Sequence, residues 1–349
     1  MVSRRQQPLN GRTPSVKDVA AAAGVSLGTV SNVMNRPEVV SIGTRERVER
    51  AMSDLGFVRN ESARQLRAGT SRTLAYVMLD GSNPFFHDVA QGIELAAEDS
   101  DLSLFICNSN SRPEREEMHL DRLMQQRVQG ILITPVNPDS PTLDEVSRRG
   151  IPVVIVDRLR ESGGFCSVAV DDVLGGRIAA EHLLATRGDA LVLVNGPASI
   201  PQCADRRSGA RAALADRGLD PHRLVEVEVA EMTIDAGREA GRRLADAGSL
   251  PSGVFCTNDL LAVGVIRGLA DRGVRVPHDV AVVGYGDLSV AGDGMSALTS
   301  VVQPKADFGR AAMHLLLDEI RDDGTHAHAS TLFAPSLVVR ESAPLAGHV

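Results

Sequence analysis

From residue 74 onward, short apolar runs alternate with helical stretches, and this alternation constrains the fold more than any other feature. The first runs are LAYVML (74–79), LSLFIC (102–107), GILIT (130–134) and PVVIV (152–156), with helical periodicity near 86–98 and 114–126. A second series contains ALVLVN (190–195), LVEVEV (224–229), GVFCT (253–257) and VAVVGY (280–285). Buried strands that are joined by helices predict two doubly wound α/β units with parallel sheets.

The end of the chain adds a short strand at 300–302, a helix near 305–321 and a strand at 335–339, which can return to either unit. Ligands of open parallel sheets bind at the carboxyl ends of the strands. The first strand is followed by DGSNPFF rather than Gly-x-Gly-x-x-Gly, and the sequence contains no P-loop. The histidines in predicted helices, His87, His119, His182 and His314, are isolated. We therefore expect neither an enzyme nor a cofactor.

Residues 16–35, VKDVAAAAGVSLGTVSNVMN, predict two short amphipathic helices that are joined by a glycine turn. Ser15 and Asp18 can form a capping box, and Gly24 can end the first helix in a left-handed conformation. Ser26 is a suitable N-cap for the second helix. The apolar residues of both helices recur at helical spacing and form one buried stripe: Val16, Val19, Ala20, Ala23, Val30, Val33 and Met34.

A third helix over residues 41–55 places Val48, Ala51, Met52 and Leu55 at the same spacing, so three helices can close one small core. The second helix keeps small or uncharged residues on its outer face. Such a helix can enter the major groove of DNA. The sequence therefore predicts a helix-turn-helix that reads DNA.

Charge is divided unevenly along the chain, whose net charge is −8. Residues 1–72 hold 12 Arg and Lys against 6 Asp and Glu, whereas the remainder carries −14. A basic head on an acidic body is typical of phosphate binding by the head alone. The sequence begins with a polar basic tail and contains neither a signal peptide nor a membrane span. We expect a cytoplasmic, nucleoid-associated protein with no membrane partner.

Four cysteines, Cys107, Cys166, Cys203 and Cys256, are scattered without a Cys-x-x-Cys pair or a nearby run of histidines. This spacing predicts reduced thiols and no metal site. Residues 60–69, NESARQLRAG, predict a helix of about two turns, which is too short to be stable alone.

The order of these elements resembles the lactose-repressor and galactose-repressor family of bacterial transcription regulators, over nearly the whole chain. The motifs that carry the resemblance are VKDVAAAAGVS with TVSNVMN, NESARQL, NPFF (83–86), VDR (156–158), Arg206-x-x-Gly209, Asn258-Asp259, VPHDVAVVGYGD (276–287), Gln303-Pro304 and LVVRES (337–342). The resemblance implies a small all-α helix-turn-helix DNA-binding domain and an α/β body like a periplasmic binding protein, with two doubly wound parallel-sheet subdomains.

The resemblance also implies which residues meet DNA. Leu27, Gly28 and Asn32 would face bases in the major groove, and Asn32 is suited to adenine. Ser26, Thr29, Ser31 and Asn35 would bind phosphates. Gly28 replaces the usual long polar residue, so we expect relaxed specificity at one base pair. In the hinge helix, Leu66 would wedge into a central minor-groove step, with Ala63 at the contact between the two hinge helices.

In the same family an effector binds between the two subdomains. Carried over by position, the effector residues are Asn83, Phe85, Phe86, Asp157, Arg158, Arg206, Asn258 and Gln303. Phe85 and Phe86 could instead be core residues, and Asp157 could pair with an arginine. Two positions depart from sugar-binding relatives, because Gly286 replaces an Asp and Met232 replaces a common aromatic residue. These losses leave open a smaller or anionic effector, or a sugar that Asp287 reaches.

We expect a basic tail at 1–14, the DNA-binding domain at 15–59, a hinge helix and linker at 60–72, and the body at 73–349. The body would divide into an N-subdomain (73–168 and 301–332) and a C-subdomain (169–300 and 333–349). The predicted function is a homodimeric repressor of a carbohydrate-use operon, which binds a near-palindromic operator and a small-molecule effector, a sugar or a related metabolite. Control by a protein co-regulator and a sugar-transport component are the alternatives.

Overall fold

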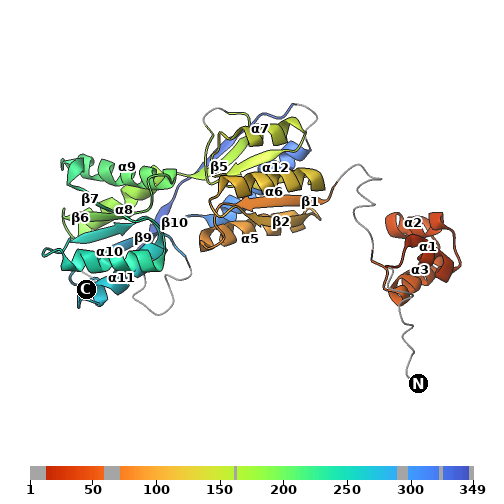
Figure 1. The fold of residues 1–349 in the computed structure, drawn as a ribbon, viewed down its shortest axis with the longest axis horizontal. Helices are drawn as coiled ribbons and strands as arrows, with labels where there is room; N and C mark the ends of the chain where they lie inside the picture. Colours follow the sequence, from red (N-terminus) through yellow and green to blue (C-terminus); the bar gives the residue numbers. More distant parts are fainter. Residues whose placement is uncertain (1–12, 59–70, 161–162, 289–297, 322–324, 346–349) are drawn as a thin grey trace, which may run out of the picture. The chain divides into compact units, whose positions relative to one another are not determined.

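The computed structural model describes residues 13–58, 71–160, 163–288, 298–321 and 325–345 (Figure 1). The chain forms two compact units, a head within Met1–Thr70 and a body within Ser71–Val349. Among the described residues, no helix has the length and apolar character needed to cross a membrane.

The head contains the three predicted helices, α1 (Val16–Ala23), α2 (Leu27–Asn35) and α3 (Ile42–Leu55), with a 3-10 turn at Pro37–Val39. Asp18 Oδ2 accepts hydrogen bonds from the amide of Ser15 at 2.7 Å and from its hydroxyl at 2.6 Å, which fixes the start of α1. Gly24 ends α1 at φ +63°. The expected apolar stripe forms the core of the head: Val19, Ala20, Ala23, Val30, Val33, Val48 and Ala51. The predicted helix-turn-helix is confirmed.

The first subdomain of the body is built on a six-stranded parallel sheet of order β11-β5-β4-β3-β1-β2. Its strands are β1 (Thr73–Met78), β2 (Ser103–Asn108), β3 (Gly130–Ile133), β4 (Val153–Val156), β5 (Cys166–Val170) and β11 (Ser330–Phe333). Its helices are α5 (Pro84–Glu98), α6 (Pro113–Gln126), α7 (Pro141–Arg148) and α12 (Lys305–Ile320). The core beneath α5 and α12 is separate from the core beneath α6 and α7.

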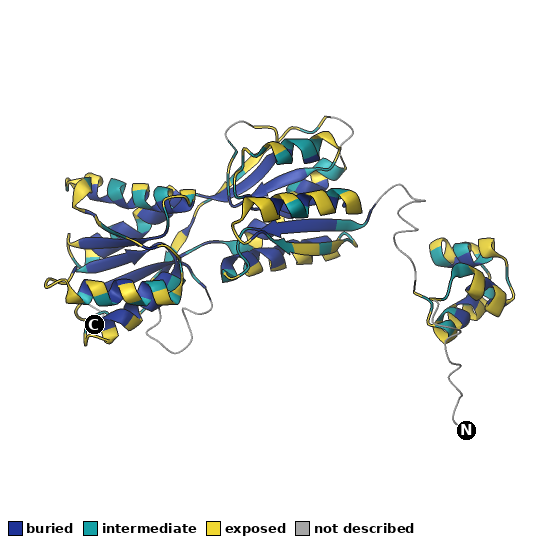
Figure 2. Cartoon of the chain, viewed as in Figure 1, coloured by how far each residue is buried: buried dark blue, intermediate teal, exposed yellow. Residues whose placement is uncertain are grey.

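The second subdomain repeats this plan with the order β12-β10-β9-β8-β6-β7. Its strands are β6 (Leu191–Asn195), β7 (Val225–Glu228), β8 (Gly253–Cys256), β9 (Ala281–Gly286), β10 (Thr299–Val302) and β12 (Ser336–Val338). Its main helices are α8 (Asp172–Thr186), α9 (Pro201–Asp216), α10 (Ile234–Asp246) and α11 (Asp259–Ala270), with a 3-10 turn at Pro221–Arg223. Only β12 among the described strands runs antiparallel to its neighbour, β10. Figure 2 shows the central strands of both sheets as buried ribbons beneath helices with exposed outer faces, whereas the edge strands β2, β7, β11 and β12 are partly exposed.

The late elements divide between the subdomains. Strands β10 and β12 join the second sheet, whereas α12 packs on α5 and on the first sheet. Two strands, β5 and β11, are absent from the sequence prediction. Strand β11 lies at the edge of its sheet with alternating exposure, and polar residues interrupt the apolar runs of both strands, so neither has the continuous apolar character of a central strand.

The chain passes between the subdomains at residue 171, at 303–304 and at 334–335. The carboxyl ends of the parallel strands in both sheets border the space between the subdomains, because residues that follow β1, β2, β4, β7, β8 and β10 all line one cleft there. This is where the doubly wound fold is expected to hold a ligand.

Candidate functional site: a DNA-reading helix and an effector cleft

The outer face of α2 carries the residues that are predicted to read bases. Leu27 is 47% exposed, and Gly28 and Asn32 are exposed, whereas Val30 and Val33 point into the core. A Cβ at Gly28 would meet only Ser26 Oγ, at 3.6 Å. Packing therefore does not require a glycine here, and the missing side chain leaves open space on the reading face.

The predicted phosphate ligands lie around the same helix and bond to one another in the head. Ser26 Oγ accepts a hydrogen bond from the amide of Thr29 at 3.1 Å and lies 2.9 Å from its hydroxyl. Asn35 Nδ2 donates to the carbonyl oxygen of Ser31 at 2.9 Å. Ser26 thus caps the helix end at which anions bind most readily. The two hinge residues, Ala63 and Leu66, lie outside the described residues.

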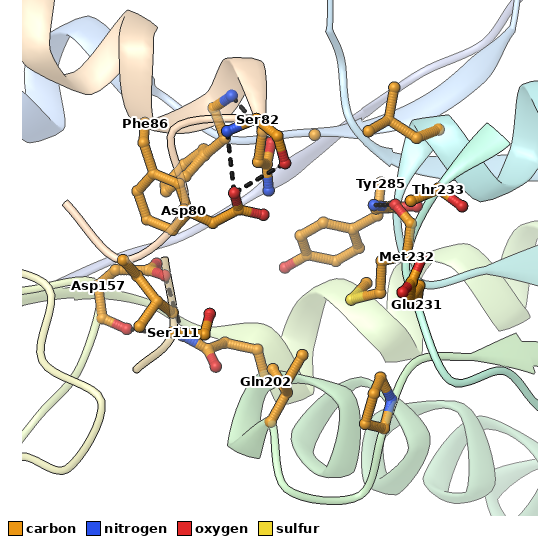
Figure 3. Close-up of a pocket in the computed structure, with 18 of the residues that line it drawn as sticks. Asp80, Ser82, Phe86, Ser111, Asp157, Gln202, Glu231, Met232, Thr233 and Tyr285 are labelled. Atoms are coloured by element: carbon orange, nitrogen blue, oxygen red, sulfur yellow. Dashed lines mark hydrogen bonds between the residues drawn. The ribbon is translucent and has the colours of Figure 1, made fainter. Parts of the chain in front are cut away.

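A cleft of about 560 Å³ lies between the two subdomains (Figure 3). Seven of the eight predicted effector residues line it: Asn83, Phe85, Phe86, Asp157, Arg206, Asn258 and Gln303. The eighth, Arg158, is not among the described residues that line the cleft. The sequence motifs thus bring together residues that are up to 220 positions apart in the chain.

One wall is the start of α5. Asn83 caps this helix, with its Oδ1 accepting a hydrogen bond from the amide of Phe85 at 3.0 Å. Phe85 and Phe86 are 6% and 4% exposed and pack edge to face with a centroid distance of 5.2 Å. Both phenylalanines belong to the first core and also line the cleft, so a core position is compatible with the predicted contact with an effector.

Asp157 follows β4 in a left-handed conformation, at φ +65°. Its Oδ2 accepts a hydrogen bond from Gln202 Nε2 at 2.9 Å, and no ion pair joins it to Arg158 or Arg206 among the described residues. Burial, together with the nearby charge of Asp172, raises the pKa of Asp157 to about 7. Two buried acceptors, Asp157 Oδ1 and Gln202 Oε1, have no hydrogen-bond partner in the described part of the chain. The cleft therefore offers two buried acceptors to a ligand that has donors.

Arg206 is held by a buried network that sequence reasoning missed. Its Nε donates to Asp172 Oδ1 at 2.8 Å, and its Nη1 donates to the carbonyl oxygen of Thr257 at 2.6 Å. The guanidinium lies 3.7 Å from the ring centroid of Tyr285, whose hydroxyl donates to Asp172 Oδ1 at 2.7 Å. Burial alone would lower the pKa of Arg206, but the Asp172 carboxylate outweighs this effect and raises it. The positive charge of Arg206 is therefore neutralised inside the protein.

Two glycines allow this network to form. An added Cβ at Gly209 would collide with the carbonyl oxygen of Val173, and one at Gly176 would collide with that of Arg206. Helices α8 and α9 can therefore approach closely only with glycine at these positions, and this approach places Asp172, in the first turn of α8, beside Arg206 on α9. The Arg206-x-x-Gly209 motif thus contains a residue that lines the cleft, Arg206, and the glycine that allows α8 and α9 to pack closely enough to position it.

The remaining predicted residues have defined structural partners. Asn258 caps α11 by accepting from the amide of Leu261 at 2.8 Å, and it donates to the carbonyl oxygen of Met232 at 3.1 Å. Asn258 thus fixes the loop that presents Met232 to the cleft (Figure 3). Gln303 lines the cleft at the crossover and is 5% exposed.

One of the two departures from sugar-binding relatives, Gly286, has an unusual backbone conformation. Gly286 lines the cleft at φ +124°, a conformation that residues with side chains rarely adopt. Asp287 does not substitute for it, because Asp287 Oδ1 accepts a hydrogen bond from Arg340 at 2.7 Å and the residue does not line the cleft. Sequence reasoning also missed several lining residues: Asp80, Ser82, Ser111, Gln202, Glu231, Thr233 and Tyr285. Most of these residues follow the end of a strand, whereas Gln202 lies in the first turn of α9 and Tyr285 belongs to the GYGD motif.

A helix-turn-helix head joined to a body with a cleft between two α/β subdomains defines a ligand-responsive DNA-binding regulator. Residues 15–60 match the description "Bacterial regulatory proteins, lacI family", and residues 180–343 match a periplasmic binding protein-like domain. The chain is 31% identical to the ribose operon repressor of Escherichia coli over 307 residues, which cover 88% of this chain and 93% of that repressor.

Two further relatives agree with this match. The HTH-type transcriptional repressor PurR of Photobacterium profundum is 29% identical over 94% of this chain and 98% of its own length. The crystal structure of the lac repressor dimer bound to operator and the anti-inducer ONPF superposes with a TM-score of 0.83 at 27% identity, over 95% of this chain and all of that chain. The protein belongs to the LacI family of bacterial regulatory proteins, which confirms the resemblance and the fold that it implied.

Proposed function

We propose that this protein is a homodimeric repressor that binds a near-palindromic operator and is controlled by a neutral, polyhydroxylated metabolite in the cleft, such as a sugar. The observation that carries the effector class is the pair of buried acceptors, Asp157 Oδ1 and Gln202 Oε1, that have no partner among the described residues. Hydroxyl groups of a sugar would donate to both, which would remove the cost of leaving these atoms buried and unpaired.

The charges around the cleft argue against an anionic effector. Asp80, Asp157 and Glu231 line it, and the one arginine among its described lining residues, Arg206, is paired with Asp172. Among the described residues that line the cleft, a phosphate or carboxylate would therefore meet carboxylates and no unpaired cation. The cleft volume of about 560 Å³ falls in the range of small-molecule sites, and the Phe86 and Tyr285 rings supply apolar faces beside polar groups (Figure 3).

On DNA, α2 would read bases through Leu27, Gly28 and Asn32, while Ser26, Thr29, Ser31 and Asn35 would contact phosphates. Residues 60–72 would act as the hinge, with Leu66 as the minor-groove wedge and Ala63 at the helix contact. The body would be one unit from residue 73, and its two subdomains would meet where the chain crosses, at 171, 303–304 and 334–335. Such a regulator would catalyse no reaction, and it would act at the chromosome, with the nucleoid in the cytoplasm.

Linkage would connect the cleft to DNA. An effector that binds one angle between the subdomains better than another shifts their equilibrium, and the shift changes the affinity of the dimer for its operator. The free energy by which the effector shifts this equilibrium cannot exceed the difference between its binding free energies for the two angles. The crossovers at 171, 303–304 and 334–335 are the segments about which such a rotation would occur.

A thermal-shift screen tests the effector class. Neutral pentoses, hexoses and polyols should raise the melting temperature, and phosphorylated sugars and purines should not, because a ligand at 100 times its Kd adds about 2.7 kcal/mol of stability. A hit should then change operator binding by the purified protein without any added partner. Asp157→Asn should abolish the response, whereas the exposed control Asp121→Asn should keep it. Stabilisation by anions alone would refute the proposed effector class, and a requirement for a second protein would favour the co-regulator alternative.

A further inference from the structure

A cluster of metal-ligating side chains lies in the first subdomain, away from the residues that line the cleft. It consists of Cys166, Glu319, His326 and His328, whose ligand atoms all lie within 4.8 Å of one another. Cys166 is the first residue of β5, Glu319 lies in the last turn of α12, and the two histidines precede β11. Strand β5 and helix α12 pack together in this subdomain (Figure 1).

The distances are close to those of a four-coordinate zinc site. Cys166 Sγ lies 3.1 Å from His326 Nε2 and 3.9 Å from His328 Nδ1. With zinc bonds of about 2.3 Å to sulfur and about 2.0 Å to nitrogen, tetrahedral geometry requires a sulfur–nitrogen separation of about 3.5 Å. His326 Nε2 lies 4.0 Å from Glu319 Oε2, where the same geometry requires about 3.3 Å. Each of these three separations differs from the tetrahedral value by less than 1 Å.

The sheet itself brings these residues together. Strand β11 pairs with β5 so that Ser330 lies opposite Ser167, which places the residues before β11 beside Cys166. His326 and His328 are two positions apart in a segment without helical structure, a spacing that puts both side chains on the same side of an extended chain. The amide of Ala329 donates to Cys166 Sγ at 3.4 Å, as backbone amides do to zinc-bound thiolates.

The spacing of the sequence concealed this arrangement. Cys166 and His326 are 160 residues apart, so no short ligand motif links them. The expectation of no metal site rested on local spacing alone. Among the described residues, Cys166, Glu319, His326 and His328 form the one group of Cys, His, Asp and Glu side chains that lie close enough together to hold a metal ion.

We propose that Cys166, Glu319, His326 and His328 bind one Zn²⁺ ion. The Cys166 thiol would lose its proton to solvent as the zinc–sulfur bond forms, and two imidazole nitrogens and one carboxylate oxygen would complete the shell. Four protein ligands leave no open position for substrate, so the ion has a structural role. It would fasten β11 to β5 and α12 immediately before the chain crosses at 334–335, and so stabilise the first subdomain at one end of a crossover.

Cobalt titration of the full-length protein tests this site. After the protein is stripped with a chelator, one Co²⁺ per chain should give the visible absorption of tetrahedral cobalt and a thiolate-to-cobalt charge-transfer band, and Zn²⁺ should displace both. Cys166→Ser should abolish the charge-transfer band. His326→Ala and His328→Ala should each weaken Zn²⁺ binding by more than about 100-fold, because even residues behind the ligands change metal affinity by about 10- to 100-fold.

Matched controls separate the site from adventitious binding. Cys107→Ser on β2 and the exposed His314→Ala on α12 should bind Co²⁺ with wild-type spectra and affinity. Zn²⁺ should raise the melting temperature of the wild type but not of His328→Ala, whose exposed imidazole can be removed without disturbing the core. If Cys166→Ser does not fold, His328→Ala alone decides the result. Co²⁺ spectra without a thiolate band, or unchanged affinity in His328→Ala, would overturn the proposal.

Discussion

The buried pair of Arg206 and Asp172 gives the most quantitative prediction. Asp172 Oδ1 accepts from Arg206 Nε at 2.8 Å and from the Tyr285 hydroxyl at 2.7 Å, and the Arg206 and Asp172 side chains are 10% and 7% exposed. Asp172→Leu would leave a buried guanidinium that keeps its hydrogen bond to the Thr257 carbonyl oxygen but has lost its carboxylate partner. Removing one partner of such a pair costs about 3–5 kcal/mol.

The double variant should behave differently from the single one. Arg206→Met combined with Asp172→Leu replaces both charges with apolar groups, and such replacements are often neutral or stabilising. The double variant should therefore lose less than the sum of the two single losses, with a coupling of about 2–3 kcal/mol. Loss of Arg206 should also remove the effector response, because Arg206 lines the cleft.

Urea denaturation can measure this coupling with a built-in reporter. The sequence has two tyrosines and no tryptophan, and Tyr76 and Tyr285 lie in different subdomains. In a Tyr76→Phe background, tyrosine fluorescence reports on Tyr285 beside Arg206, and far-ultraviolet circular dichroism reports on the whole chain. A loss of less than about 1 kcal/mol in Asp172→Leu, or additive losses in the double variant, would refute the assigned role of the pair.

Three further predictions follow from single residues. The pKa of Asp157 is raised to about 7, so folding favours its protonated form. The stability of the free protein should therefore fall by up to about 4 kcal/mol as pH rises from about 4 to about 7. Asp157→Asn should flatten the plot of melting temperature against pH. In thermal unfolding, Gly286→Ala should destabilise the body by about 1–3 kcal/mol, because its φ is +124°. Gly28→Ala should instead stabilise the head by up to about 1 kcal/mol, because an added Cβ there has space. A stabilising Gly286→Ala or a destabilising Gly28→Ala would contradict these assignments. Asn32→Ala should relax one symmetric position of a selected operator while Ser26→Ala weakens all sequences equally, and an unchanged site preference in Asn32→Ala would exclude base reading.

The elements that the sequence predicted well are those whose signals are local. Ser15, Asp18 and Gly24 determine the ends of α1 through contacts within a few residues, and the apolar stripe of the head follows from helical spacing. The central strands were predicted because both of their faces are buried, which makes each strand an unbroken apolar run. Their alternation with helices then determines the parallel sheets.

The features that the sequence could not predict depend on contacts between distant residues. Motif order placed seven effector residues in the cleft, but it could not show that Arg206 is neutralised by Asp172, which lies 34 positions away. Arg158 follows Asp157 directly, yet only Asp157 lines the cleft, because successive residues after a strand need not point to the same side. Cys166 and His326 approach each other only because β11 pairs with β5.

The position of β11 has a consequence for synthesis of the chain. The first sheet contains β1 to β5, which the ribosome completes by residue 170, but its edge strand ends at residue 333. At about 5–20 residues per second, roughly 10–30 s separate these two points. Through that interval the edge of β5 has no partner strand and α12 cannot yet cover its face of the sheet, so the nascent protein exposes an apolar surface that a chaperone could bind. A fragment that ends before residue 305 would lack both α12 and β11 and would keep this surface exposed.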